Sequence, residues 1–239
     1  MRSARLERTP MIAGPDDTDA CTVWVADVAA ERPFHSDLLD PDERGRRAAL
    51  RRPADQARFT VAAAMIRLVA AGLTGTPPAT IAVDRRCPGC GRAHGKPRLP
   101  GTGLEVSVSH SADRVLLAVT HAGPVGVDVE RITGADTSTL AGRVLAPGEP
   151  VRRPRDFFVY WCRKESAVKA TGDGLRVPLS EVVVRPADAP AGLLSYRGSR
   201  LTAAMADLDV GPGYAAAVTV LTGRPVRVWL RDAGTALAE

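Results

Sequence analysis

The chain has 239 residues, 45% of them hydrophobic and 25% charged, with a formal net charge of +5. This composition is that of a globular protein with one large or two small domains, and it excludes a disulfide scaffold or a disordered chain. We find neither an apolar run of the ~18 residues that a membrane span needs nor the apolar core of a secretory signal, so we expect a cytoplasmic protein. The basic excess favours an anionic partner: nucleic acid, a phosphorylated small molecule or an acidic protein.

A strand and two helices are predicted first. Alternating apolar residues indicate a strand over Cys21–Val28. Pro41 begins a short basic helix that runs to Leu50, and a longer helix begins at Pro53. In the longer helix apolar residues recur at steps of three and four until about Gly75, which is typical of an amphipathic helix. Thr80–Val83 then favours a short strand, followed by a Gly/Pro-rich loop.

Three strand-like runs come next, separated by only a few turn-forming residues. Such short connections favour antiparallel neighbours. The runs are Leu104–His110, Arg114–His121 and Val125–Ile132.

The remaining chain predicts two helices and several strands. The helices are expected over Thr137–Leu145 and Asp156–Ala170, separated by a proline-rich loop over Pro147–Pro154. The order of elements indicates an α+β protein of two similar halves, residues 1–122 and 123–239. The last strands are expected at Glu181–Arg185, Leu193–Tyr196, Ala203–Leu208, Ala215–Leu221 and Val226–Arg231.

A pair of acids stands out in the strand that begins at Val125. Because alternate strand residues face opposite sides, its valines share one face, whereas Gly126, Asp128 and Glu130 share the other. Two neighbouring carboxylates repel each other unless a cation lies between them, and Mg²⁺ prefers such oxygen ligands. We interpret Gly126 as leaving room for a ligand. The alternative is an exposed face with two solvated acids.

A second pattern lies on the helix expected from Asp156. Trp161, Glu165 and Lys169 are four residues apart and therefore share one face. Glu165 is a candidate metal ligand or general base, and Lys169 a candidate partner for a phosphate or a leaving oxygen. An ordinary helical ion pair is the alternative. The 32 basic residues include only three lysines: Lys96, Lys164 and Lys169. Because lysine, unlike arginine, can give up a proton, we look for catalytic chemistry first at these three positions.

Weaker patterns complete the set. Ser109 and His110, at the end of a strand, suit either a phosphate contact or a capped turn. Cys87, Cys90 and His94 invite a zinc site, for which His35, Cys21, Cys162 or His121 would have to supply a fourth ligand; a turn that carries two thiols is the alternative. The basic helix around Arg46 and Arg58 would either grip phosphates or form a solvated face.

Together, in this order and spacing, the motifs resemble the larger, monomeric class of 4′-phosphopantetheinyl transferases, which serves nonribosomal peptide and polyketide synthases. The resemblance extends from about Leu39 to Tyr214. It is carried by His94–Pro97, Ser107–Ser111, Gly126–Glu130, Trp161–Lys169 and Gly172–Leu175.

The resemblance implies two α/β halves related by a pseudo-twofold axis, each an antiparallel sheet with packed helices, with coenzyme A in the cleft between them. It implies that Asp128, Glu130 and Glu165 hold Mg²⁺, or Mn²⁺ in its place. It further implies that Glu165 is the base for a carrier-protein serine and that Lys169 assists the departure of 3′,5′-ADP. The remaining coenzyme A contacts that it implies are Arg46, Arg58, Gly95, Lys96, Pro97, Ser109 and His110.

Two departures from the family pattern and one rival function remain. Glu43 stands where some members carry a basic residue, and the Pro147–Pro154 region, which helps to dock the carrier protein in the family, is short. The rival is a basic nucleic-acid-binding protein with a zinc element at Cys87 and Cys90, although aromatic residues make up only 4% of the chain. Our expectation is a monomeric enzyme without nucleic-acid or membrane partners.

Overall fold

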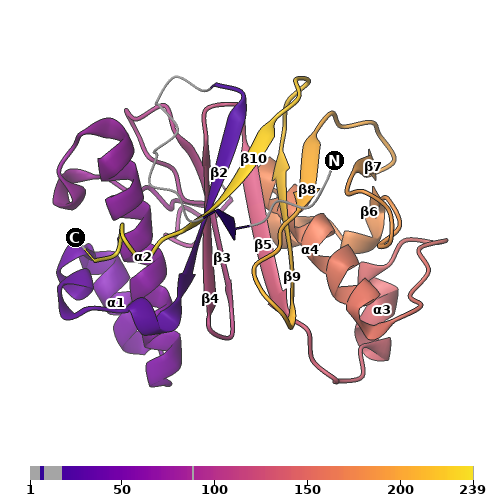
Figure 1. Ribbon diagram of the computed structural model, residues 1–239, viewed down its shortest axis with the longest axis horizontal. Coiled ribbons are helices and arrows are strands. Elements are labelled where there is room, and N and C mark those ends of the chain that lie inside the picture. Colours follow the sequence, from indigo (N-terminus) through magenta and orange to yellow (C-terminus); the bar gives the residue numbers. More distant parts are fainter. Residues whose placement is uncertain (1–5, 8–17, 88, 239) are drawn as a thin grey trace.

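The computed structural model describes residues 6–7, 18–87 and 89–238. Two β-sheets face each other, and one long helix covers the outer face of each sheet (Figure 1). The helices are α1 (Pro41–Ala49), α2 (Pro53–Thr74), α3 (Ser138–Val144) and α4 (Pro154–Thr171). The strands are β1 (Leu6–Glu7), β2 (Ala20–Asp27), β3 (Glu105–Ser111), β4 (Arg114–Thr120), β5 (Val125–Arg131), β6 (Val182–Val184), β7 (Leu193–Tyr196), β8 (Ala204–Asp207), β9 (Tyr214–Val220) and β10 (Arg227–Asp232).

The predicted α+β class is confirmed, and most elements lie within one or two residues of their expected bounds. The strand expected over Thr80–Val83 is wrong. A 3₁₀ turn occupies Pro78–Thr80, and an isolated bridge joins Asp84 to Arg98. Pro78 takes the first position of this turn, where the fixed φ of proline suits a helical conformation and its missing N–H costs nothing.

The first sheet has the strand order β1-β10-β2-β4-β3. Its β2, β4 and β3 pair in the antiparallel manner that their short connections predict. However, β10 pairs in parallel with both β2 and β1, so this sheet is mixed and the expectation of a purely antiparallel sheet is wrong. The last strand of the chain therefore completes the sheet that the first half begins.

The second sheet, β5-β9-β8, is antiparallel throughout. The short connection from β4 predicts that β5 pairs with β4, and this prediction is wrong because β5 pairs with β9 instead. The chain changes sheets at Gly123, whose φ is +142°. A Cβ atom there would lie 2.5 Å from the carbonyl oxygen of Leu221, so only glycine fits.

The main core lies between the two sheets, where the valines of β5 meet apolar residues of β2 and β4. A second core lies between the first sheet and α2. In the described part of the chain, α2 is the one helix long and apolar enough to cross a membrane, which the sequence analysis does not anticipate. Most of its apolar residues are instead buried, and Met65 and Ile66 are fully buried in the core against the sheet.

Helix α4 lies directly on β5 and β9 (Figure 1). A Cβ atom on Gly126 would lie 1.9 Å from the carbonyl oxygen of Ser166 and 2.5 Å from the amide nitrogen of Ala170. Gly126 thus makes room for the helix backbone and not for a ligand, which corrects our interpretation of this residue. The close approach positions the polar residues of α4 over those of β5.

Candidate active site

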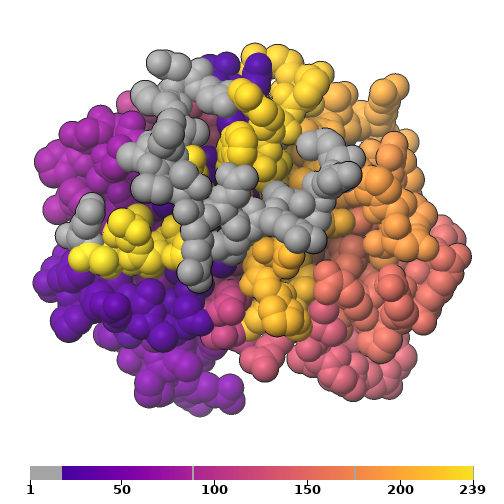
Figure 2. Space-filling model, in the orientation of Figure 1, coloured from indigo at the N-terminus to yellow at the C-terminus, as the bar shows by residue number. Residues whose placement is uncertain are grey.

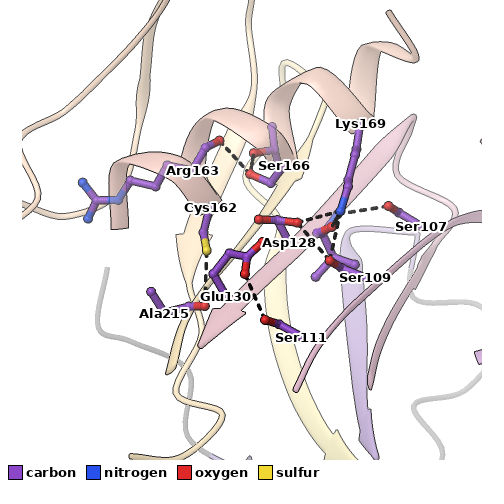
Figure 3. A network of polar contacts seen from close by, with 12 residues as sticks. Ser107, Ser109, Ser111, Asp128, Glu130, Cys162, Arg163, Ser166, Lys169 and Ala215 are labelled. Carbon is purple, nitrogen blue, oxygen red and sulfur yellow. Dashed lines mark hydrogen bonds and ion pairs between the residues drawn. The ribbon is translucent and has the colours of Figure 1, made fainter. Parts of the chain in front are cut away.

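Strands β3 and β5 belong to different sheets, and serine side chains connect them. The hydroxyl oxygen of Ser107 accepts a hydrogen bond from the backbone N–H of Val127 at 3.1 Å. That of Ser111 accepts one from the N–H of Arg131, also at 3.1 Å. In Figure 3 Ser111 faces Glu130, and Ser109, between the other two serines in the sequence, faces Asp128 and Lys169. The alternation of serine and valine in β3 thus brings its polar face to the edge of the second sheet.

Asp128 lies at the centre of the site with only 3% of its surface exposed. Its Oδ1 atom is 2.6 Å from Nζ of Lys169 and accepts a hydrogen bond from Ser109 at 2.9 Å (Figure 3). Its Oδ2 atom is buried and has no hydrogen-bond partner among the described residues. A buried carboxylate oxygen without a partner is costly, so this atom is available to a further cationic group.

Lys169 is held by three residues from two strands, β3 and β5. Besides Asp128, its ammonium group donates to Ser109 Oγ at 3.0 Å and to the carbonyl oxygen of Val127 at 3.2 Å. Lys169, Glu165 and Trp161 are partly exposed, whereas the residues between them on α4 are almost all buried. The predicted shared face of α4 is therefore the face that reaches the solvent beside β5.

The charge of Asp128 also affects the carboxylates of Glu130 and Glu165. Glu130 accepts a hydrogen bond from Ser111 at 2.9 Å, and burial, followed by the charge of Asp128, raises its pKa. Burial and then Asp128 also raise the pKa of Glu165, and Glu165 adds to the shift at Glu130. The three acids therefore repel one another across a common space.

This donor set fits a hard divalent cation. Mg²⁺ takes carboxylate oxygens, and Asp128 offers a buried oxygen without a partner beside two acids whose repulsion a cation would relieve. In the arrangement described here Lys169 supplies the positive charge, and the three acids do not form a set of ligand atoms within 4.8 Å of one another.

The loop with Gly95, Lys96 and Pro97 reaches the same site from the first half of the chain. Nζ of Lys96 donates to the carbonyl oxygen of Ala170, the residue after Lys169, at 3.2 Å. Burial lowers the pKa of Lys96, although Glu105 at 3.8 Å opposes this shift. Two of the three lysines, Lys96 and Lys169, thus lie at the same end of α4, although they are more than 70 positions apart in the sequence.

His110 and Arg58 flank the other side of Lys169. His110 is exposed, but the protein packed beside its ring lowers its pKa, and the charges of Arg58 and Lys169 lower it further. Arg58 donates to the carbonyl oxygen of Ala112 at 2.8 Å and pairs with Asp55. The two cations beside His110 suit an anionic ligand.

Arg46 and Arg85 form a basic pair that the sequence analysis recognises only in part. Arg46 donates to the carbonyl oxygen of Ala93 at 2.6 Å and lies over the ring of Phe59. Burial and then the charge of Arg46 lower the pKa of Arg85. The Nε atoms of both arginines are buried without a partner in the described structure. No sequence signal marks Arg85, because an arginine before a cysteine-rich loop belongs to no motif.

Two conspicuous residues of the sequence do not join this group. Glu43 is fully buried and pairs with Arg67 at 2.8 Å, so it stabilises the α1–α2 junction. Lys164 is also fully buried, and its ammonium lies 2.6 Å from Glu149. It ties α4 to the proline-rich loop instead of entering the active site.

The three residues Cys87, Cys90 and His94 lie together outside this site. Each offers a ligand atom, and these atoms all lie within 4.8 Å of one another. The sulfur of Cys90 is 2.9 Å from Nε2 of His94. Hydrogen bonds from the backbone amides of Gly89 and Cys90 lower the pKa of Cys87.

None of the four expected candidates completes that group. His35 is fully buried, and its Nε2 atom is 2.9 Å from the carbonyl oxygen of Leu237. Cys21 and Cys162 are fully buried in core clusters, as the sequence predicts. His121 contacts the carbonyl oxygen of Gly103.

Comparisons with known proteins agree with this site. A model of the 4′-phosphopantetheinyl transferase superfamily matches residues 124–219, which include β5, α4 and all but the last residue of β9. The chain is 30% identical over 169 residues to the 4′-phosphopantetheinyl transferase HetI of Nostoc sp., a match that covers 65% of this chain and 68% of that protein. It is also 30% identical over 143 residues to a 4′-phosphopantetheinyl transferase of Bacillus subtilis, covering 56% of this chain and 60% of the relative.

A shorter match of 38% identity over 88 residues connects it to the 4′-phosphopantetheinyl transferase AcpT of Salmonella typhi, covering 33% of this chain and 46% of that protein. The chain thus spans less than two thirds of the length of the second and third relatives. The HetI match is long enough to decide the family, and the matched segment contains Asp128, Glu130, Glu165 and Lys169. The chain therefore belongs to the 4′-phosphopantetheinyl transferase superfamily.

Proposed function

We propose that this protein transfers the 4′-phosphopantetheine group of coenzyme A to a serine of an apo acyl or peptidyl carrier protein and releases 3′,5′-ADP. The observation that carries this proposal is that Asp128 and Glu130 of β5 and Glu165 and Lys169 of α4 are close enough to influence one another electrostatically, within the segment matched by the family. Phosphoryl transfer depends on such charge neutralisation and positioning more than on covalent chemistry.

In this proposal Asp128, Glu130 and Glu165 hold a Mg²⁺ ion, with Mn²⁺ as a substitute. The ion supplies charge neutralisation at the pyrophosphate of coenzyme A. The buried, unpartnered Oδ2 of Asp128 and the raised pKa of both glutamates support this ligand set.

The reaction then needs a base for the carrier serine and a cation at the leaving group. Glu165, whose carboxylate has no hydrogen-bond partner in the described structure, accepts the proton of the carrier serine directly or through water. The serine oxygen forms a bond to the phosphorus of the phosphopantetheine phosphate, and the bond from that phosphorus to the bridging pyrophosphate oxygen breaks. Lys169 stabilises the negative charge on the departing 3′,5′-ADP.

The nucleotide end of coenzyme A would lie against the first half of the chain. Gly95, Lys96 and Pro97 line this end, while Ser109 and His110 contact the phosphates. Arg46 and Arg58 provide further positive charge. Arg85 joins Arg46 in our proposal because two adjacent, partly buried arginines whose Nε atoms have no partner in the described structure favour a bound anion. The 3′-phosphate is the group of coenzyme A that we assign to this pair.

The carrier protein is proposed to dock near the loop between α3 and α4. Val151 and the arginines at 152, 153 and 155 are exposed there, a combination that suits an acidic surface with some apolar area. We further propose that the enzyme is a cytoplasmic monomer, of the holo-[acyl-carrier-protein] synthase type, that serves polyketide or nonribosomal peptide synthesis. A pseudo-twofold relation of its halves is proposed from their shared plan of one long helix on one sheet.

One assay tests the activity directly. The protein is incubated with coenzyme A, Mg²⁺ and an apo carrier protein, and the carrier is weighed by mass spectrometry. We expect a mass increase equal to one phosphopantetheine group, which chelation of Mg²⁺ abolishes. A carrier that stays apo across several carrier families would count against the proposal. The comparisons do not support the alternative of a nucleic-acid-binding protein.

A further inference from the structure

A cluster of two thiols and one imidazole lies at the tip of the loop that precedes Lys96. Cys87, Cys90 and His94 bring their ligand atoms within 4.8 Å of one another. A tetrahedral zinc ion with Zn–S of about 2.3 Å and Zn–N of about 2.0 Å requires ligand atoms separated by roughly 3.5–3.8 Å. The contact between Cys90 and His94, at 2.9 Å, is shorter than this range and the other distances stay below 4.8 Å, so side-chain movements on the order of 1 Å would complete the geometry.

The backbone around these residues is already folded into a closed turn. The N–H of Cys87 donates to the carbonyl oxygen of Arg92, and that of Gly91 donates to the carbonyl oxygen of Cys87, both at 2.8 Å. Gly91 has a φ of +72°, which glycine adopts without strain. The turn orients both sulfur atoms and the imidazole toward one point without any help from a packed core.

We propose that Cys87, Cys90 and His94 form a zinc site with three protein ligands and a fourth position open to water. The combination of two thiolates and one imidazole favours Zn²⁺ over Mg²⁺, which takes oxygen ligands. The site is therefore chemically distinct from the carboxylate site between β5 and α4. Cys90 and His94 are both exposed, so an ion can enter from solvent.

The position of the loop indicates that zinc would order part of the nucleotide site. This role rests on the proposed function. Just beyond His94, Gly95 donates to the carbonyl oxygen of Arg85 at 2.6 Å, and Lys96 reaches α4. Arg46 also holds the loop at Ala93. A zinc ion at the tip would fix both ends of the segment that joins Arg85 to Lys96, two residues assigned to the nucleotide.

Metal content tests the site without any reference to activity. The full chain is purified without chelator, and bound zinc is measured by mass spectrometry of the elements. We expect about one zinc per chain, lost in Cys90→Ser and His94→Gln. Arg92→Gln is the matched control, because Arg92 is an exposed residue of the same turn that contributes only its backbone; it should keep its zinc.

Cobalt substitution of the wild-type chain provides a second readout that does not depend on the folding of a variant. Co²⁺ bound by two thiolates should give a sulfur-to-metal charge-transfer band in the near ultraviolet that one equivalent of Zn²⁺ abolishes. Absence of the band under reducing conditions, or equal zinc in wild type and Cys90→Ser, would overturn the site. So would a Cys87–Cys90 disulfide that persists in reductant. Because these readouts need no turnover, they separate failure of the zinc site from failure of the transferase proposal.

Discussion

At the scale of single residues, Lys169 combines a structural and a proposed chemical role. Its ammonium neutralises the buried Asp128 at 2.6 Å, so its removal leaves a carboxylate without its cation. We expect Lys169→Ala to lower kcat by about 10²-fold or more while changing the KM for coenzyme A much less. Steady-state kinetics on an apo carrier protein measure both values. Arg131→Gln, an exposed change at the end of β5, serves as the control; an unchanged kcat in Lys169→Ala would remove the proposed role of this lysine.

The raised pKa of Glu165 predicts that the stability of the metal-free protein depends on pH. Burial and Asp128 raise its pKa, so the native state retains the proton at a pH where the unfolded chain, with a pKa of about 4.3, has lost it. The native state therefore binds more protons in this window, and the free energy of unfolding falls as pH rises through it. At pH values above this window the carboxylate is charged in both states, and the loss in the free energy of unfolding remains constant.

The corresponding variant is Glu165→Gln in the presence of chelator. It should be more stable than wild type at neutral pH, whereas the difference should vanish in acid, where both side chains are neutral. Urea unfolding across the pH range measures this. The same variant should lose catalytic activity by about 10²–10⁴-fold if Glu165 is the base. Equal stability of both proteins at every pH would contradict the raised pKa.

Arg85, which we assign to the 3′-phosphate, has a matched control in its neighbour Arg86. Arg85 is partly buried beside Arg46, whereas the side chain of Arg86 is 79% exposed and pairs with Asp84. We expect Arg85→Gln to raise the KM for coenzyme A by roughly tenfold, the loss of one charged hydrogen bond. The KM for dephospho-coenzyme A should stay constant. Arg86→Gln should change neither value, and an equal effect on both substrates would assign Arg85 elsewhere.

At the scale of elements, the contact of α4 with β5 depends on Gly126. A methyl group at this position would lie 1.9 Å from the Ser166 carbonyl oxygen, which belongs to helix backbone and has no free direction in which to move. We expect Gly126→Ala to lower the free energy of unfolding by about 1–3 kcal/mol or more, as measured by urea unfolding. Gly142→Ala is the control, since nothing lies within 4 Å of a Cβ there. A fully stable Gly126→Ala protein would contradict this packing.

Elements also show how far sequence patterns determine structure. The periodicity after Pro53 predicts α2 almost to the residue, and the run Leu193–Tyr196 is β7 as expected. Both signals are local, since they depend on which face of one element is apolar. The strand expected at Thr80–Val83 fails because its apolar residues follow two prolines, and this run is too short for its pattern to outweigh them.

At the scale of the whole molecule, the two halves are interlocked. Strand β10 lies between β1 and β2, and the residues that follow it run along the first half near α2 (Figures 1 and 2). Ala233 and Leu237 are buried in the core beneath α2, and Leu237 contacts His35. The domain boundary near Gly123 remains a prediction. The first sheet contains strands from both sides of that boundary, because β10 pairs with β2.

This interlocking predicts that the first half does not fold alone. A fragment of residues 1–122 lacks β10 and would expose one edge of β2 and part of the core beneath α2. We expect it to show no cooperative thermal transition, whereas co-expression with residues 123–239 restores one. Far-UV circular dichroism follows both. A sharp unfolding transition of the isolated fragment would show that β10 is dispensable for this sheet.

The sequence by itself determined the elements and the order of the polar motifs, because both follow from local periodicity and residue chemistry. It also determined that Asp128 and Glu130 share one face of a strand. Only the tertiary structure decided that β5 leaves the first sheet at Gly123, that Gly126 accommodates α4, and that Arg85 lies beside Arg46. These arrangements depend on which distant segments together bury the most apolar surface, a property of the whole chain that no local pattern contains.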